Sequence, residues 1–357
     1  MRQANTTAGM VFIDHKPLLE FVQQIFIFNG LSQEDARTAA CALVKANLRG
    51  VDSHGVARVA MYCERLRRRV ANPCPDIRVN RVATAVSQVD GDNGLGLVVG
   101  KRGMAEAIAL AGKTGIGLVG VKNSGHYGMG ALYVLQAIEA GCVGLAFTNA
   151  SPALAVWGGN RPFLGTSPIT AGAPTGDGPP FLLDMACSVV ARGKLKFAAQ
   201  RGESIPQGLA LDREGRPTTD GQAAFEGVML PLGGVKGSGL SMLMDVLSGV
   251  LTGAAYGGRV RNPFTGLDGY QGTGHFFVAL KADLFMALET FQERMNDLAA
   301  RVKSQPVAEG FDQVMMPGEP EQKIELERLD SGIPITPDVV GTLKSEADLA
   351  GIAFPAN

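Results

Sequence analysis

Two short segments of this chain set a histidine among glycines, and together they hold two of its four histidines. The first is Asp52–Arg58 (DSHGVAR) and the second is Asn123–Gly130 (NSGHYGMG). Histidine is the side chain that exchanges protons most readily near neutral pH, and glycine permits a tight turn or the close approach of a ligand. The pairing predicts a site at which a proton moves, with His54 and His126 as candidate carriers.

The first segment also carries a pattern that favours anion binding. We expect a helix to begin at Ser53, a good N-cap residue, and to run towards Arg69. In such a helix His54 and Arg58 share one face, and an apolar set lies on the opposite face: Val56, Val59, Ala60, Cys63 and Leu66. An arginine there can clamp a carboxylate with two parallel hydrogen bonds. The alternative is an ordinary solvated face with a capping serine.

His126 follows an expected strand, and Asp184 ends an apolar run. His126 lies between an expected strand ending at Val121 and an expected helix near Leu132. Loops in that position often contact ligands, although a structural turn histidine is equally consistent with the pattern. Asp184 ends the run 181–183 and could accept hydrogen bonds from a sugar hydroxyl or from loop amides.

Two glycine-rich segments invite opposite interpretations. Gly233–Gly239 (GGVKGSG) precedes an apolar helix expected over 239–251, and its free amides with Lys236 would form an anion cradle. Gly115–Gly120 matches the GxGxxG pattern, but it lies inside an apolar strand instead of opening a helix. It therefore does not predict a classical dinucleotide fingerprint.

Composition narrows the class of protein. Of the 357 residues 46% are apolar and 19% charged, with a formal net charge of -1, so we expect a folded protein without nucleic-acid or membrane partners. The five cysteines are widely spaced and form no CxxC pair, which favours free thiols in a reducing, cytoplasmic location. The first residues lack the apolar core of a signal peptide. No spacing of histidines and carboxylates supports a metal site, and we expect none.

Periodicity predicts the elements that must position these residues. Helices are expected over 14–28 and from Ser32, with Asp35 in a capping box, to about residue 50, and the sequence NPCP at 72–75 ends this helical unit. Further on, strands are expected at 83–89, 115–121, 143–148 and 275–280, and helices at 104–111, 132–140, 239–251 and 283–302. Interleaved strands and helices predict an α/β or α+β class. The polar tail from Pro306 is expected to wrap the surface.

Six segments in the same order resemble the malate/L-lactate dehydrogenase family of nicotinamide-dependent oxidoreductases, over about residues 14–335. They are Ser53–Arg58, Asn123–His126, Gly165–Pro168, Asp184–Ala186, Ala191–Lys194 and Lys236–Leu240. The resemblance implies a non-Rossmann NAD(P)-binding domain with a large mixed, mostly antiparallel sheet, and a helical domain made from both chain ends. We place the helical, substrate-binding domain at 1–80 with 283–357 and the NAD(P)-binding domain at 81–282. The resemblance also implies a homodimer or a dimer-based assembly.

The resemblance implies hydride transfer between NAD or NADP, with NAD favoured, and C2 of a small 2-hydroxy or 2-keto carboxylic acid. Malate, lactate, ureidoglycolate and sulfolactate are all candidate substrates. It assigns proton transfer to His54 or His126 and includes Ser53, which precedes His54, among the catalytic residues. It assigns substrate contacts to Arg58, Thr166 and Arg192. It implies cofactor contacts at His126, Tyr127, Gly128, Met129, Gly130, Ala150, Asp184, Met185, Ala186, Lys236 and Gly237.

One residue departs from a branch of this family. In its cyclic imino-acid reductases an aspartate in the Ala-x-Gly-x segment completes a serine–histidine–aspartate relay, and this chain has Lys194 there. The departure favours a 2-hydroxy or 2-keto acid. A pyrroline- or piperideine-2-carboxylate reductase and a catalytically silent anion-binding homologue are the alternatives.

Overall fold

The computed structural model describes residues 9–355, and their contacts divide the chain into two compact units. The first unit runs to Arg69 and resumes at Glu319, whereas the second unit is Val70–Gly318. The expected boundary at 283 differs from this division, because the segment after the last strand stays with the sheet. There the Leu182 backbone N–H donates to the Pro317 carbonyl oxygen at 3.0 Å.

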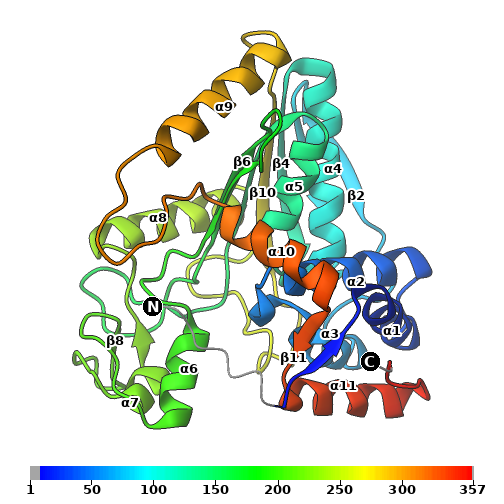
Figure 1. Cartoon of the computed structure of the whole chain (residues 1–357). Coiled ribbons are helices and arrows are strands. Elements are labelled where there is room, and N and C mark those ends of the chain that lie inside the picture. The colour runs from blue at the N-terminus through cyan, green and yellow to red at the C-terminus, as the bar shows by residue number, and fades with distance from the viewer. Residues whose placement is uncertain (1–8, 356–357) are drawn as a thin grey trace. The chain divides into compact units, whose positions relative to one another are not determined.

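The first unit is helical and draws on both ends of the chain (Figure 1). Its elements are β1 (Val11–Ile13), α1 (His15–Phe28), α2 (Gln33–Leu48), α3 (Val59–Arg67), α10 (Glu319–Ser331), β11 (Ile333–Ile335) and α11 (Pro337–Ala350), with β1 antiparallel to β11. Four apolar residues of α1 recur at helical spacing on one face, and they are all buried: Leu18, Phe21, Val22 and Ile25. The Ser32 cap is confirmed, because its hydroxyl accepts the Asp35 N–H at 3.1 Å.

The tail from Pro306, which we expected to wrap the surface, folds into regular elements from Glu319 onward. The tail forms α10, β11 and α11, and Leu343 and Ala347 of α11 are buried. Its apolar residues are sparse, so local composition concealed a segment that is stabilised by packing against the N-terminal helices.

The second unit is built on one seven-stranded sheet in the order β2-β3-β4-β10-β5-β6-β7. The strands are β2 (Arg78–Ala83), β3 (Val86–Asp90), β4 (Ile116–Ser124), β5 (Cys142–Thr148), β6 (Ile169–Ala173), β7 (Phe181–Met185) and β10 (Thr273–Lys281). Only β3 and β4 run parallel, so the predicted mixed, mostly antiparallel sheet is confirmed. The single strand expected at 83–89 is instead the hairpin of β2 and β3.

Helices α4 (Gly96–Thr114), α5 (Ala131–Glu139) and α9 (Leu288–Lys303) accompany this sheet. Gly117 of β4 faces α4 so closely that a Cβ there would collide with the Ala107 carbonyl oxygen. Gly115 ends α4 with a φ of 82°. These glycines therefore serve helix–strand packing and a helix cap, which agrees with rejecting them as a phosphate-binding fingerprint.

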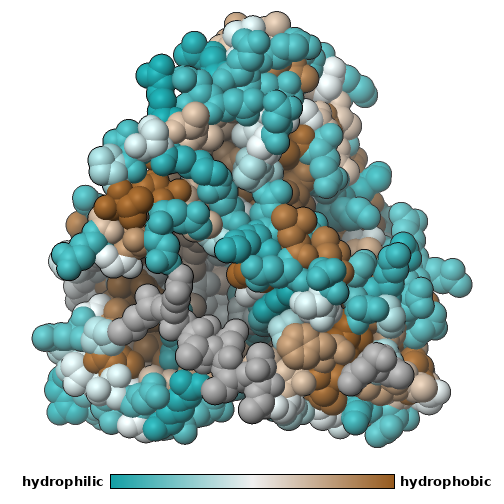
Figure 2. Space-filling model, in the orientation of Figure 1, coloured by the Kyte–Doolittle hydropathy of each residue, from teal (hydrophilic) through white to brown (hydrophobic). Residues whose placement is uncertain are grey.

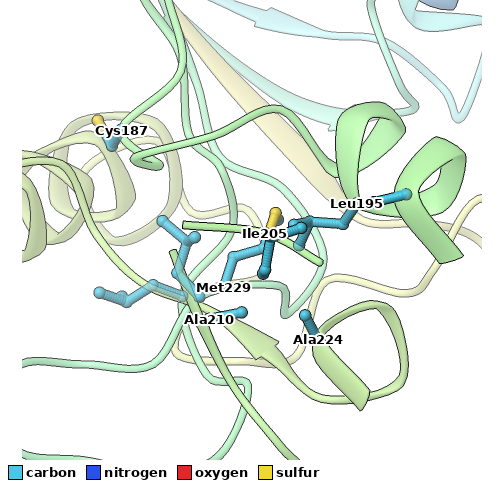
Figure 3. Close-up of a cluster of buried hydrophobic side chains, with 9 residues drawn as sticks. Cys187, Leu195, Ile205, Ala210, Ala224 and Met229 are labelled. Atoms are coloured by element: carbon cyan, nitrogen blue, oxygen red, sulfur yellow. The ribbon is translucent and has the colours of Figure 1, made fainter. Parts of the chain in front are cut away.

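A smaller part of the second unit carries several of the predicted site segments. It contains α6 (Arg192–Arg201), β8 (Ala210–Leu211), α7 (Gly221–Glu226), β9 (Val228–Met229) and α8 (Val235–Asp245), which continues into a π-helical turn (Val246–Val250). Its apolar core, shown in Figure 3, comprises Leu154, Leu164, Cys187, Leu195, Ala198, Ile205, Ala210, Ala224 and Met229. Several residues of this core lie close in sequence to a predicted substrate or cofactor contact. Leu164 is near Thr166, and Cys187 follows Ala186 directly. Met229 is seven residues before Lys236. This core therefore fixes the segments that carry those contacts.

Candidate functional site

The helix expected to start at Ser53 is replaced by two short 3₁₀ turns. These turns are Asp52–His54 and Val56–Arg58, and the α-helix begins only at Val59. Gly55 separates them with φ −89° and ψ −148°, which is an extended conformation that no helix can include. Ser53 is therefore not an α-helical N-cap, and His54 and Arg58 do not share a helical face by i,i+4 spacing.

Side chains from α2 and α10 hold this turn in place. The Asn47 Oδ1 atom accepts the Val56 N–H at 2.7 Å, and its Nδ2 donates to Asp52 Oδ1 at 2.6 Å. A Cβ at Gly55 would collide with the Asn47 side chain, so only glycine fits there. The Arg328 guanidinium donates to both carboxylate oxygens of Asp52, at 2.6 Å and 3.0 Å, and also to the Asn47 carbonyl. The sequence did not reveal either Asn47 or Arg328. Arg328 is remote in sequence from Asp52, and no motif marks Asn47 as a partner of the turn.

The turn brings Ser53, His54 and Arg58 together by contacts other than those predicted. The Ser53 hydroxyl lies 3.0 Å from His54 Nδ1, and Arg58 Nε donates to the Ser53 carbonyl at 2.6 Å. His54 is half-buried, and burial followed by the charge of Arg58 lowers the pKa of its ring from 6.5 to about 4. At neutral pH His54 is therefore an uncharged imidazole next to a fixed cation, a pair suited to accept a proton beside a bound carboxylate.

In the second unit, the end of β7 joins several predicted segments. Asp184 Oδ2 accepts the Ala131 N–H at 2.8 Å, and Oδ1 accepts the Thr170 hydroxyl at 2.9 Å. Of the two roles considered for this carboxylate, the structure shows the bond to a loop amide. Asp184 thereby fixes the N-terminus of α5, where a negative charge is favourable, and ties it to the loop His126–Gly130.

Cys187, just beyond β7, links two more segments through its backbone. Its N–H donates to the Thr166 carbonyl at 2.8 Å, and its carbonyl accepts the Leu232 N–H at 2.9 Å. The structure thus places Thr166, the segment Asp184–Ala186 and the turn before Lys236 side by side. Ala150 joins this group, because a Cβ at Gly165 would lie 2.6 Å from the Ala150 carbonyl oxygen.

The glycine-rich turn before α8 differs in detail from the expected anion cradle. Gly233 and Gly234 adopt φ values of 57° and 64°, and α8 begins directly after them, at Val235. The amides of Lys236 and Gly237 are not free, since they donate to the carbonyls of Gly233 at 3.4 Å and Leu232 at 2.7 Å. The exposed Lys236 ammonium and the positive end of the helix remain available to attract an anion.

Trp157 packs beside the same turn and lies outside the core. It is 64% exposed, and a Cβ at Gly234 would lie 2.7 Å from its ring. Its backbone N–H donates to the Ser238 hydroxyl of α8 at 2.9 Å. An exposed aromatic ring therefore lies at the turn that precedes Lys236.

Burial distinguishes the residues of the loop after β4. His126 is half-buried, whereas the side chains of Tyr127 and Met129 are only 2% and 4% exposed. Burial raises the pKa of the Tyr127 hydroxyl well above its ordinary value. Tyr127 and Met129 therefore serve the core through their side chains, and only their backbone could reach a ligand.

Arg192 and Lys194 begin α6, and both are exposed. The guanidinium of Arg192 lies 5.5 Å from the centre of the Phe225 ring and donates to the Phe225 carbonyl at 3.4 Å. Arg192 is thus anchored to α7 on the surface of the second unit.

The residues around the end of β7 fit a dinucleotide. The exposed Lys236 ammonium at the start of α8 suits a phosphate, and the exposed Trp157 ring suits a base or a nicotinamide. Among residues 9–355, no three His, Cys, Asp or Glu side chains are grouped to hold a metal ion. No helix of the described residues is both long and apolar enough to cross a membrane.

Comparison with known proteins identifies a family and several relatives. The family model described as malate/L-lactate dehydrogenase matches residues 13–344. The malate dehydrogenase of Pyrococcus horikoshii is 40% identical over 343 residues, which cover 94% of each chain. A ureidoglycolate dehydrogenase (NAD(+)) of Escherichia coli is 34% identical and covers 94% of this chain and 95% of its own. A (2R)-3-sulfolactate dehydrogenase (NADP(+)) of Chromohalobacter salexigens is 38% identical over 70% of this chain and 75% of its own.

The structural comparison agrees with the sequence comparison. The solved structure of the Pyrococcus horikoshii malate dehydrogenase superimposes with a TM-score of 0.90 at 36% identity and covers 99% of each chain.

Proposed function

We propose a division of tasks within this chain, which belongs to the malate/L-lactate dehydrogenase family and is an NAD(P)-dependent dehydrogenase acting on a CH–OH group. Its substrate is a small 2-hydroxy acid or the corresponding 2-keto acid. In the proposal His54 and Arg58 act on the substrate, and the segments joined at the end of β7 hold the dinucleotide.

The observation that carries the assignment of His54 is its bond to Ser53 beside the fixed Arg58 guanidinium. With its pKa lowered to about 4, the ring is in the form that accepts a proton from a C2 hydroxyl. For His54 Nε2 to accept that proton, Nδ1 must carry the ring proton and donate it to the Ser53 hydroxyl. His126 is the alternative carrier, and the comparison of the two variants in the Discussion decides between them.

Arg58 is proposed to bind the substrate carboxylate. The bond from Nε to the Ser53 carbonyl fixes the guanidinium plane, and a planar guanidinium can hold a carboxylate in a bidentate pair. Once the carboxylate is bound, its negative charge offsets the guanidinium charge that lowers the pKa of His54. Substrate binding would therefore raise the basicity of the proton carrier when it is needed. Thr166 and Arg192 are proposed as further substrate contacts.

The proposed cofactor contacts are the loop His126–Gly130, Ala150, the segment Asp184–Ala186, Lys236 and Gly237. When bound, the nicotinamide ring supplies or accepts the hydride at substrate C2. Lys236 would pair with a phosphate, and Asp184 would keep the start of α5 in position. Relatives with either NAD(+) or NADP(+) in their names match this chain, and we propose NAD as the preferred cofactor.

The overall proposal is tested by a steady-state assay that follows the absorbance of reduced cofactor. A panel of 2-keto acids, including oxaloacetate, pyruvate and sulfopyruvate, is assayed with NADH and with NADPH. We expect turnover of at least one keto acid and a higher kcat/KM with NADH. Turnover of a cyclic imino acid alone would contradict the proposed substrate class, and no turnover at all would favour a silent anion-binding protein.

Lys236→Ala is expected to weaken dinucleotide binding more than substrate binding. Losing a hydrogen bond to a charged group costs about 1.5–3 kcal/mol, so the cofactor Kd should rise about tenfold or more. Titration calorimetry with the dinucleotide measures this, and Lys196→Ala, which removes another exposed lysine of the second unit, is the matched control. An unchanged Kd in Lys236→Ala would identify Lys236 as a merely solvated cation.

We further propose that the enzyme is a cytoplasmic homodimer and that a second copy covers the apolar face of α8 and its π-helical turn. Five large apolar residues there are at least 46% exposed: Met242, Leu243, Val246, Val250 and Leu251. Figure 2 shows hydrophobic residues gathered over α8. The only charged side chain within 239–251, Asp245, bonds inward to Asn149 and to the Gly257 N–H. An uncharged stripe of this length is typical of a surface that another protein covers.

Val246→Glu is expected to convert the dimer to monomers. An uncompensated buried charge costs about 3–5 kcal/mol, which weakens association by more than about 100-fold. Sedimentation equilibrium measures the mass, with Val82→Glu on the exposed edge strand β2 as the control. A wild-type monomer, or an unchanged mass in Val246→Glu, would contradict this interface.

A further inference from the structure

The loop that carries His126 has an irregular backbone. Asn123 adopts a φ of 52°, which is uncommon for a residue other than glycine, and Gly128 has a φ of 76°. The pairing of β4 with β10 shifts register at the same level, because Thr273 faces Ser124 whereas His275 faces Val121. A loop of this kind gains little from regular strand bonds, so other contacts must hold it in one conformation.

Two side chains provide such contacts, one just before β10 and one within it. Gln271 is 5% exposed, and its Oε1 accepts the His126 backbone N–H at 2.9 Å. His275 is fully buried, and its Nε2 lies 2.8 Å from the Ser124 hydroxyl. The ring of His275 also stacks on Tyr127, with centroids 4.9 Å apart and planes at 11°. Three of the four consecutive residues 124–127 are therefore bonded to or stacked on residues of the segment 271–275.

Hydrogen-bond accounting assigns the tautomer of His275. The Thr148 hydroxyl lies 2.9 Å from the Gly274 carbonyl, 3.0 Å from the Asn149 carbonyl and 2.7 Å from His275 Nδ1. It has one proton, and two carbonyl oxygens compete for it, so Nδ1 carries the ring proton and donates it to Thr148. His275 Nε2 is then an acceptor, and the Ser124 hydroxyl donates to it. Burial lowers the pKa of His275 to about 3, which keeps the ring neutral and this pattern intact at pH 7.

The opposite side of the loop is closed by the start of α4. A Cβ at Gly96 would collide with the carbonyl oxygens of Gly125 and His126. Tyr133 of α5 stacks on Tyr127 and donates its hydroxyl proton to the Tyr127 carbonyl. The loop is thus enclosed by β10, α4 and α5, and the backbone N–H of His126 donates to the Gln271 side chain.

We infer that Gln271 and His275 are positioning residues that hold the backbone of the loop Ser124–Met129 and thereby set the place of His126. Neither residue needs to touch a substrate or a dinucleotide for this role. The consequence for catalysis rests on the proposed function of that loop, in cofactor binding or proton transfer.

The test combines a structural and a kinetic readout on the same variants. Gln271→Met removes the acceptor with little change in volume, and Gln271→Glu retains an acceptor at the same distance along the chain. Gln88→Leu is the matched control, because Gln88 makes a comparable bond to the Thr252 carbonyl, 3.0 Å long, elsewhere in the second unit. Ser124→Ala removes the bond to His275 while leaving that buried ring in place, in case His275 variants do not fold.

In Gln271→Met we expect amide hydrogen exchange at His126 to speed up about fivefold, since one neutral hydrogen bond contributes about 1 kcal/mol. The dinucleotide Kd or kcat should worsen by a similar factor, and Gln271→Glu should restore the exchange rate and the kinetics together. Ser124→Ala should show the same pair of effects at Ser124–Tyr127. The melting temperatures of Gln271→Met and Gln88→Leu should be similar.

Unchanged exchange at His126 in Gln271→Met would overturn the inference. So would equal kinetic losses in Gln271→Met, Gln271→Glu and Gln88→Leu that follow the melting temperature, because that result identifies a purely structural role. Faster exchange with unaltered cofactor binding and kcat would support the positioning of the loop and instead overturn the proposed role of that loop in the reaction.

Discussion

Replacing His54 by alanine is expected to lower kcat by about 10²–10⁴-fold, the usual contribution of a general acid–base group, in a protein that still folds. The fold should survive because the turn is held by Asn47, Asp52 and Arg328 and not by the imidazole. Steady-state kinetics under saturating cofactor measure the loss. His15→Ala, which removes another half-buried histidine of the first unit, is the control.

The pH dependence sharpens this prediction. In the free enzyme the pKa of His54 is lowered to about 4, so its basic form persists as the pH falls and is lost only near pH 4. For oxidation of the hydroxy acid, kcat/KM should therefore show no acid limb near 6.5 from this group. The profile of kcat reports the enzyme–substrate complex, and there the limb should move to higher pH because the bound carboxylate offsets the Arg58 charge. Identical limbs in both profiles would contradict the coupling between Arg58 and His54.

His126→Ala is expected to damage the enzyme as well, and the comparison assigns the proton carrier. If His126 serves the cofactor, its loss should raise the dinucleotide Kd and leave kcat at saturating cofactor much less affected than in His54→Ala. A greater loss of kcat in His126→Ala would make His126 the carrier. Activity near that of the wild type in both variants would refute both assignments.

Arg58→Lys is expected to raise KM for the acid and also to lower kcat. An ammonium is a point charge and cannot reproduce the planar, bidentate guanidinium–carboxylate pair. The substrate would therefore lose orientation at C2 as well as affinity, and orientation contributes strongly to rate. We expect a rise in KM of about tenfold or more, since a charge-assisted hydrogen bond contributes about 1.5–3 kcal/mol. Arg68→Lys, at the exposed arginine that caps the C-terminus of α3, is the control.

The amide analogue of the substrate completes this experiment. Because the amide lacks the charge that pairs with Arg58, it should be a poor substrate of the wild type. Its kcat/KM should fall only slightly further in Arg58→Lys. Equal losses for the acid and the amide would show that Arg58 supports the turn through the Ser53 carbonyl. The carboxylate partner would then have to be sought elsewhere, with Arg192 as the next candidate.

The amino-acid sequence alone determined the features that depend on neighbours along the chain. The apolar period of α1 identified its buried face, and Ser32 identified the start of α2. Gly115–Gly120 lay in an apolar strand, which was enough to reject a phosphate-binding fingerprint. The order of six motifs indicated the family, and with it the mixed, mostly antiparallel sheet.

Only the tertiary structure decided which distant residues hold the candidate site. Arg328 donates to Asp52, which is 276 residues away in the sequence, and Gln271 accepts the N–H of His126, which is 145 residues away. Asp184 caps α5 from β7, a strand that was not among those expected from periodicity. Local patterns could not reveal these pairs, because periodicity reports which face of an element is buried and not which segment will cover it. For the same reason Gly55, packed against Asn47, turned the expected helix at Ser53 into two 3₁₀ turns: the decisive neighbour lies in another helix.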